Sequence, residues 1–66
     1  MDELSAMILA EISNQTLVDH TAIISDDDLA GMLGITNEAV HSAIESLIID
    51  SYLIRLNKNR YSVMFL

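Results

Sequence analysis

Residues 23–54 decide the fold, and they read IISDDDLAGMLGITNEAVHSAIESLIIDSYLI. Ser25 is followed three positions later by Asp28, which is the spacing of a capping box at the start of a helix. Leucine and alanine then recur with helical spacing until Gly34, a residue type that takes positive φ at little cost and commonly ends helices. We predict a helix over residues 26–33, and its three aspartates suit the positive end of the helix dipole.

The second half of this stretch predicts a longer helix over residues 37–50. Thr36 or Asn37 provides its cap, and Glu38 lies in the first turn. Four apolar residues recur at three- and four-residue intervals and form the buried stripe, namely Val40, Ala43, Ile44 and Leu47. At 100° per residue, the opposite side of this helix carries Glu38, Ser42, Glu45 and Ile49, with His41 and Thr36 at its flank.

The flanking segments predict one more helix, a short strand and a hairpin. Residues 2–15 show a helical stripe made by Leu4, Met7, Ile8 and Ile12. Residues 22–24 are a short β-prone run. Residues 53–65 contain two β-prone arms around the turn-forming sequence Asn57-Lys58-Asn59-Arg60.

The two arms of the hairpin also predict a register. Pairing Leu56 with Tyr61, Ile54 with Val63 and Tyr52 with Phe65 places six apolar side chains on one face. A slip of one residue would destroy that match, so we expect the register to be well specified. In this arrangement Leu53 and Met64 lie on the outer side of the hairpin.

Length and composition bound the class of protein. Sixty-six residues form one small domain, residues 1–66, without room for a large substrate cleft, and 52% apolar residues predict a folded chain. There is no cysteine, and the acidic N-terminus and its short apolar run match neither a signal peptide nor a membrane span. We therefore expect a cytoplasmic protein without membrane contact.

The charges are divided along the chain. All ten acidic residues lie in positions 1–50, whereas the three basic residues are Arg55, Lys58 and Arg60. The net charge of −7 repels nucleic acid at long range.

The order of helix, strand, helix, turn, helix and hairpin resembles the winged helix-turn-helix superfamily. The resemblance is carried by residues 23–54 together with RLNKNRYSVMF at residues 55–65. It implies an α+β fold of three helices and a two-stranded β-hairpin wing, with residues 37–50 as the recognition-type helix. The chain departs from the family in having Ser51 where a glycine usually ends that helix, and in the acidic outer side of the helix.

Two functions follow from these observations. We expect protein contact through Glu38, His41, Ser42, Glu45 and Ile49, with a partner whose surface is basic. The domain would then be an inhibitor or adaptor of a nucleic-acid-handling protein, occupying the place of phosphate as small viral or mobile-element proteins do. The alternative is a DNA-binding transcriptional regulator that acts as a dimer and contacts DNA through Thr36, Asn37, Ser42, Arg55, Lys58 and Arg60.

The sequence predicts no enzyme, cofactor or metal site. His20 and His41 are isolated, and neither has a second ligand at metal-binding spacing. The Asp26-Asp27-Asp28 run is explained as a helix start, and there is no nucleophile motif or phosphate-binding glycine loop. Homodimerisation is compatible with both functions.

Overall fold

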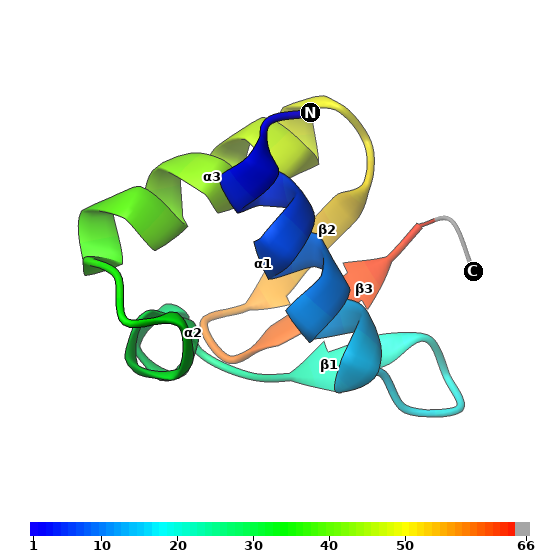
Figure 1. Cartoon of the computed structure of the whole chain (residues 1–66). Helices are drawn as coiled ribbons and strands as arrows, with labels where there is room; N and C mark the ends of the chain where they lie inside the picture. Colours follow the sequence, from blue (N-terminus) through cyan, green and yellow to red (C-terminus); the bar gives the residue numbers. More distant parts are fainter. Residues whose placement is uncertain (65–66) are drawn as a thin grey trace.

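The computed structural model describes residues 1–64 and contains three helices and a three-stranded antiparallel sheet (Figure 1). The elements are α1 (Glu3–Asn14), β1 (Thr21–Ile23), α2 (Asp26–Leu33), α3 (Asn37–Ile49), β2 (Leu53–Asn57) and β3 (Arg60–Val63). The predicted α+β class and the predicted helices are confirmed, with bounds that differ by one residue at some ends.

Each helix is preceded by a residue whose side chain accepts a hydrogen bond from one of the free backbone N–H groups in the first turn. The Asp2 carboxylate accepts from the Ser5 backbone N–H at 2.7 Å, and this hydrogen bond lowers the pKa of Asp2. Ser25 and Asp28 form the predicted capping box of α2. The Thr36 hydroxyl accepts from the backbone N–H of Ala39 at 3.1 Å, so Thr36 is the cap of α3.

The sheet has the strand order β1-β3-β2, so the predicted hairpin is one part of a larger sheet. The short run before α2 is the third strand, and it pairs antiparallel with β3, with Ala22 opposite Tyr61. This pairing ties the chain that enters α2 to the C-terminal hairpin.

The predicted hairpin register is wrong by one residue. Arg55 lies opposite Tyr61, Ile54 opposite Ser62 and Leu53 opposite Val63. The turn contains two residues instead of four, and an irregularity between Arg55 and Asn57 takes up Leu56. The predicted partner of Tyr52, Phe65, lies outside the described residues.

The register error has a physical cause in the packing of the sheet on the helices. Leu53, Tyr61 and Val63 are the buried residues of the hairpin, whereas Ile54 and Leu56 are exposed. Leu53 was expected on the outer side and is instead in the core; Met64 is exposed as predicted. The apolar match between the two arms takes no account of β1 and the helices. These elements determine which face of the hairpin is buried.

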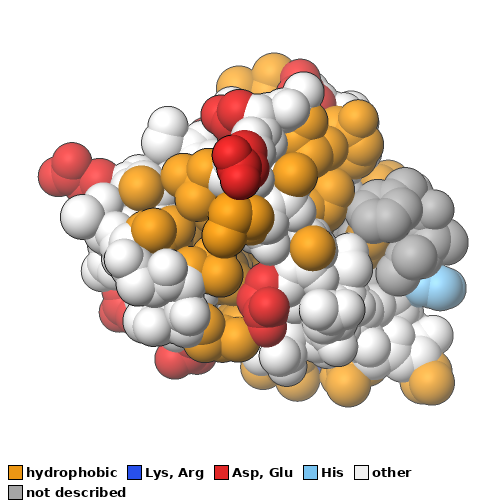
Figure 2. Space-filling view, viewed as in Figure 1, with side chains coloured by type: hydrophobic (Ala, Val, Ile, Leu, Met, Phe, Trp, Pro, Cys, Tyr) orange, Lys and Arg blue, Asp and Glu red, His pale blue; other side chains and the backbone are white. Residues whose placement is uncertain are grey.

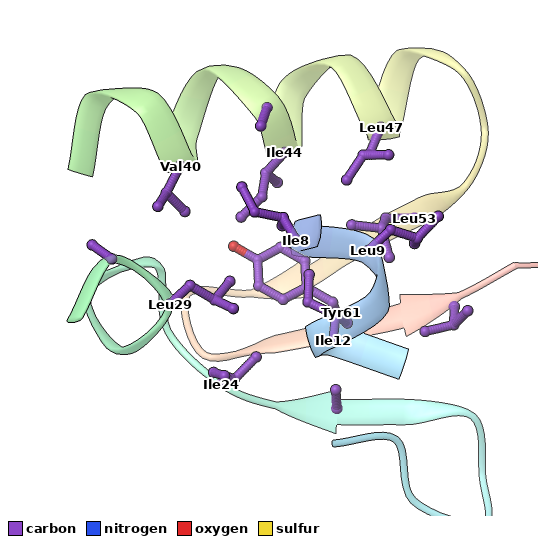
Figure 3. Packing of buried hydrophobic residues seen from close by; sticks show 14 residues of the cluster. Ile8, Leu9, Ile12, Ile24, Leu29, Val40, Ile44, Leu47, Leu53 and Tyr61 are labelled. Carbon is purple, nitrogen blue, oxygen red and sulfur yellow. The ribbon is translucent and has the colours of Figure 1, made fainter. Parts of the chain in front are cut away.

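The core lies between the sheet and the helices (Figure 3). The four apolar residues predicted for the inner side of α3 are all buried, and Tyr61 points from β3 into the middle of the cluster. In α1, Ile8 and Ile12 are buried as predicted. Met7 is not, because Leu9 takes the inward position and leaves Met7 exposed.

Candidate functional site

The side of α3 that faces away from the core carries Glu38, Ser42, Glu45 and Ile49, which we name the α3 outer face. All four residues are exposed, and Ile49 has 78% of its surface accessible. Since the inner side of α3 packs on α1 and α2, helical spacing leaves this side to solvent. No lysine or arginine lies within α3.

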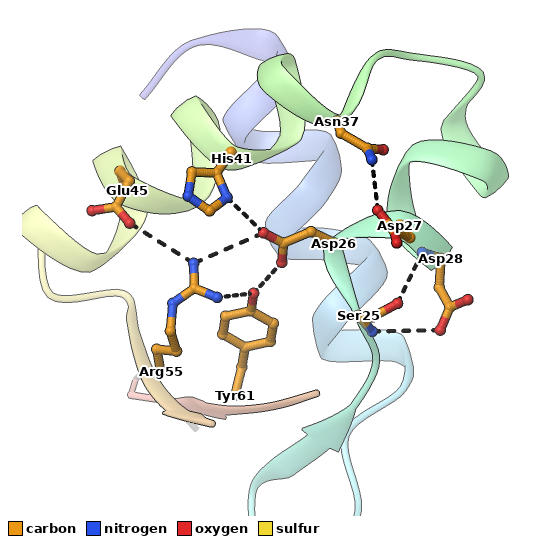
Figure 4. A network of polar contacts seen from close by, with 9 residues as sticks. All are labelled: Ser25, Asp26, Asp27, Asp28, Asn37, His41, Glu45, Arg55 and Tyr61. Atoms are coloured by element: carbon orange, nitrogen blue, oxygen red, sulfur yellow. Dashed lines mark hydrogen bonds and ion pairs between the residues drawn. The ribbon is translucent and has the colours of Figure 1, made fainter. Parts of the chain in front are cut away.

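A polar network joins the α3 outer face to α2 and the hairpin (Figure 4). Its centre is Asp26, the first residue of α2. The Asp26 carboxylate lies 2.9 Å from His41 Nδ1 and accepts a hydrogen bond from the Tyr61 hydroxyl. Arg55 Nη1 donates to that hydroxyl at 2.9 Å. Arg55 Nη2 lies 3.9 Å from Asp26 and 3.8 Å from Glu45, and we call these five residues the Asp26 network.

Tyr61 is the buried member of this network. Its side chain is fully buried, and burial raises the pKa of the Tyr61 hydroxyl, with a further contribution from the hydrogen bond to Asp26. The hydroxyl therefore stays protonated and donates to the carboxylate. The Arg55 guanidinium lies 5.1 Å from the centre of the Tyr61 ring, within the range of a cation–π contact.

The three basic residues do not form one cationic surface. The Arg55 guanidinium is engaged in the Asp26 network, and its side chain is only 30% exposed. Lys58 is exposed at the hairpin turn. Arg60 points to the other side of the sheet from Tyr61, since neighbouring strand residues alternate. Of the three predicted phosphate contacts, Arg55 is thus the one held by two carboxylates of α2 and α3, while Arg60 helps to lower the pKa of Asp19 after the hydrogen bonds from Thr21.

The N-terminal half of α3 and the start of α2 border an open hollow of about 500 Å³. It is lined by Asp26, Asp27, Asn37, Glu38, His41 and Ser42. A second hollow of about 260 Å³ lies towards the hairpin turn and shares Asp26, Asp27 and His41 with the first. Carboxylates therefore line both hollows, and the second hollow is also lined by Arg55 and Lys58.

Two of the candidate DNA-reading residues have structural partners here. Asn37 Nδ2 donates to the Asp27 carboxylate at 2.6 Å, and the Thr36 hydroxyl is used by the α3 cap. Ser42 borders the larger hollow and is exposed. The sequence alone gave Asp26 and Asp27 only a capping role, because their partners lie 10 to 35 positions away and no local pattern links them.

The histidines and carboxylates do not gather elsewhere. Within residues 1–64 there is no group of three or more His, Cys, Asp or Glu side chains placed to hold a metal ion. His20 lies before β1 with a positive φ of 65°, and its carbonyl accepts from the backbone N–H of Val63 at 2.9 Å. None of the helices described in residues 1–64 has both the length and the hydrophobicity to cross a bilayer.

The fold is winged-helix-like. Among solved structures, the reduced (FeII) CO-sensing protein from R. rubrum is similar, with a TM-score of 0.86 and 16% sequence identity. The similarity covers 92% of this chain and 31% of that one, so this chain spans about a third of the length of the CO-sensing protein. No protein-family model matches the sequence. No curated protein matches it either.

Proposed function

We propose that this winged-helix-like domain acts by protein contact, and that the α3 outer face binds a basic surface of its partner. The partner we envisage is a nucleic-acid-handling protein, which the domain inhibits or recruits. The most direct support is the charge on the side of α3 that a DNA-binding protein of this fold would place in the major groove. In this chain that side carries Glu38 and Glu45, and no basic residue.

The surroundings of the α3 outer face support the same proposal. The rim of the larger hollow adds the carboxylates of Asp26 and Asp27. A protein groove that normally holds phosphate presents lysine and arginine side chains, which complement such a cluster of carboxylates. Ile49, at the other end of the face, provides apolar area of the kind found at the centre of protein interfaces.

DNA binding is the second candidate, and it is supported by the fold, in which the helix after the turn commonly enters the major groove. The charges oppose it. Only Lys58 and Arg60 lie outside the Asp26 network, and two phosphate contacts would give a salt slope of about −1.8, which corresponds to weak backbone affinity. The carboxylates of the α3 outer face would approach a polyanion.

A titration distinguishes the two candidates. The labelled protein is mixed with a lysine- and arginine-rich peptide, and separately with a DNA duplex at about 50 mM salt, and backbone amide shifts are followed by NMR. We expect the peptide to shift the amides of Glu38, Ser42, Glu45 and Ile49, and the duplex to leave them unchanged.

The variant Glu38→Lys with Glu45→Lys should weaken peptide binding by tenfold or more, because it reverses two charges on the face. Its matched control is Glu3→Lys with Glu11→Lys, which makes the same change in net charge on α1 and should retain most of the affinity. Equal weakening by both pairs would show that only bulk charge matters and would contradict the proposal. Shifts at α3 with the duplex and none with the peptide would favour DNA reading.

A further inference from the structure

Arg55 places a positive charge against the acidic α3 outer face. It lies opposite Tyr61 in the sheet and therefore shares the inward side of the hairpin with that residue. From there its guanidinium reaches the carboxylates of Glu45 on α3 and Asp26 on α2 (Figure 4). Within residues 1–64, these two are the ion pairs that lysine or arginine makes with a carboxylate. In the view of Figure 2, by contrast, carboxylates are visible and no lysine or arginine side chain is, among the described residues.

The guanidinium of Arg55 is anchored by Tyr61. Arg55 Nη1 donates to the Tyr61 hydroxyl at 2.9 Å, and the guanidinium carbon lies 5.1 Å from the centre of the ring. Both contacts are made to a side chain that is fully buried. They do not depend on Glu45, so the positive charge stays in place when Glu45 changes its rotamer.

The contact between Arg55 and Glu45 is of a different kind. Arg55 Nη2 lies 3.8 Å from Glu45 Oε1 and 3.9 Å from the Asp26 carboxylate, and both distances are too long for hydrogen bonds. Nη2 is buried and has no hydrogen-bond acceptor among residues 1–64. The Glu45 side chain is 54% exposed, so it can turn towards a bound partner without breaking a hydrogen bond to Arg55.

We infer that Arg55 is a built-in competitor of the basic partner. Its guanidinium occupies the place beside Glu45 and Asp26 that a lysine or arginine side chain of the partner would take. Binding then requires Glu45 to exchange Arg55 for the cation of the partner, and the anchored charge of Arg55 repels that cation at the same time. This autoinhibitory contact rests on the proposed function, in which the α3 outer face binds a basic surface.

The peptide titration, repeated with two arginine variants, tests this inference. Arg55→Met removes the charge and keeps an unbranched side chain beside the Tyr61 ring. Its matched control is Arg60→Met, the same substitution in the same hairpin on the outer side of the sheet. Each variant removes one positive charge and so changes the net charge from −7 to −8. We expect Arg55→Met to bind the lysine- and arginine-rich peptide about twofold to fivefold more tightly than Arg60→Met does, which is the range of an exposed ion pair.

Equal affinities of the two variants, or weaker binding by Arg55→Met, would overturn the inference when circular dichroism shows that both variants fold. If Arg55→Met does not fold, the wild type decides. The NMR signal of the Arg55 Nε–H group should then shift as the peptide saturates the protein, and by more than that of Arg60. An Arg55 signal that does not respond would overturn the inference.

The outcome is separable from that of the proposed function. A wild type whose α3 amides respond to the peptide, together with equal affinities of the two variants, overturns the autoinhibitory contact only. A wild type that does not respond contradicts the proposed function for the native chain. A response by Arg55→Met alone would then support the autoinhibitory contact, and no response by either protein would overturn both.

Discussion

Asp26 contributes both to the start of α2 and to the contacts between α2, α3 and the hairpin. As the first residue of α2, it contributes negative charge to the helix start. Its two carboxylate oxygens also contact His41 on α3 and Tyr61 on β3. Leaving a buried polar group without its partner costs about 1–3 kcal/mol, so the Tyr61 hydroxyl depends on this carboxylate. One side chain therefore fixes α2, α3 and the hairpin relative to each other.

Because the pKa of the Tyr61 hydroxyl is raised in the folded protein, we predict that the protein loses stability in alkaline solution. Burial raises the pKa of Tyr61 above its usual value of 10.0. Above about pH 10 the unfolded chain releases this proton while the folded chain retains it, so the folded state binds more protons and stability falls as pH rises. Urea unfolding at pH 8 and pH 11 measures the effect.

Tyr61→Phe is the control for this prediction. At pH 8 it should lower the free energy of unfolding by about 1–3 kcal/mol, since it removes the donor to Asp26 and keeps the ring. At pH 11 the difference between wild type and Tyr61→Phe should shrink. A difference that does not change with pH would contradict the prediction, because the comparison cancels the other titrating groups.

At the scale of elements, the end of α3 carries a local backbone cost. Ser51 follows the helix with a φ of 67°, the left-handed conformation that glycine adopts easily. The resemblance to winged helices implied glycine at this position, and the backbone takes the glycine-like conformation although the side chain is serine. Gly34 takes the same φ at the end of α2, where the residue type suits it.

Ser51→Gly is therefore expected to stabilise the protein by about 1 kcal/mol, since a left-handed conformation is unfavourable for residues with a Cβ. The matched control is Ser46→Gly, the same substitution at an exposed position inside α3. It should destabilise by roughly 0.5 kcal/mol because glycine is a poor helix former. Chemical unfolding of both variants compares the signs, and a loss of stability in Ser51→Gly would count against the strain.

The hairpin shows where an element cannot be predicted by itself. Its two arms contain a plausible apolar match, yet the structure shifts it by one residue and exposes Ile54. The Asn57 side chain accepts from the backbone N–H of Asn59 at 2.8 Å and stabilises the two-residue turn. The choice between registers depends on which face meets α1 and α3, and that information lies outside the hairpin.

At the scale of the whole molecule, a single small core holds every element. A chain of 66 residues has an expected stability of about 3–10 kcal/mol, at 0.05–0.15 kcal/mol per residue. Its largest fully buried side chains come from α1, α2, α3 and the hairpin, and include Ile8, Leu29, Ile44 and Tyr61. Truncation of one of these side chains therefore removes a large share of the free energy of unfolding.

Ile44→Ala and Ile49→Ala test this dependence with the same substitution in one helix. Ile44 is fully buried, so its truncation should cost about 2–5 kcal/mol and can unfold the chain at room temperature. Ile49 is 78% exposed, and its truncation should change stability by no more than about 0.5 kcal/mol. Urea unfolding followed by circular dichroism measures both, and similar losses would mean that Ile49 is buried in solution.

The sequence by itself determined the helices, their caps, the turn at Gly34 and the exposed acidic side of α3. These features depend on side chains within a few positions of each other, through hydrogen bonds to neighbouring backbone groups and through helical periodicity. The tertiary structure alone decided the pairing of the short first strand with β3, the hairpin register and the Asp26 network. Those depend on contacts between residues up to 35 positions apart, where burial selects one arrangement among several that the local sequence permits equally.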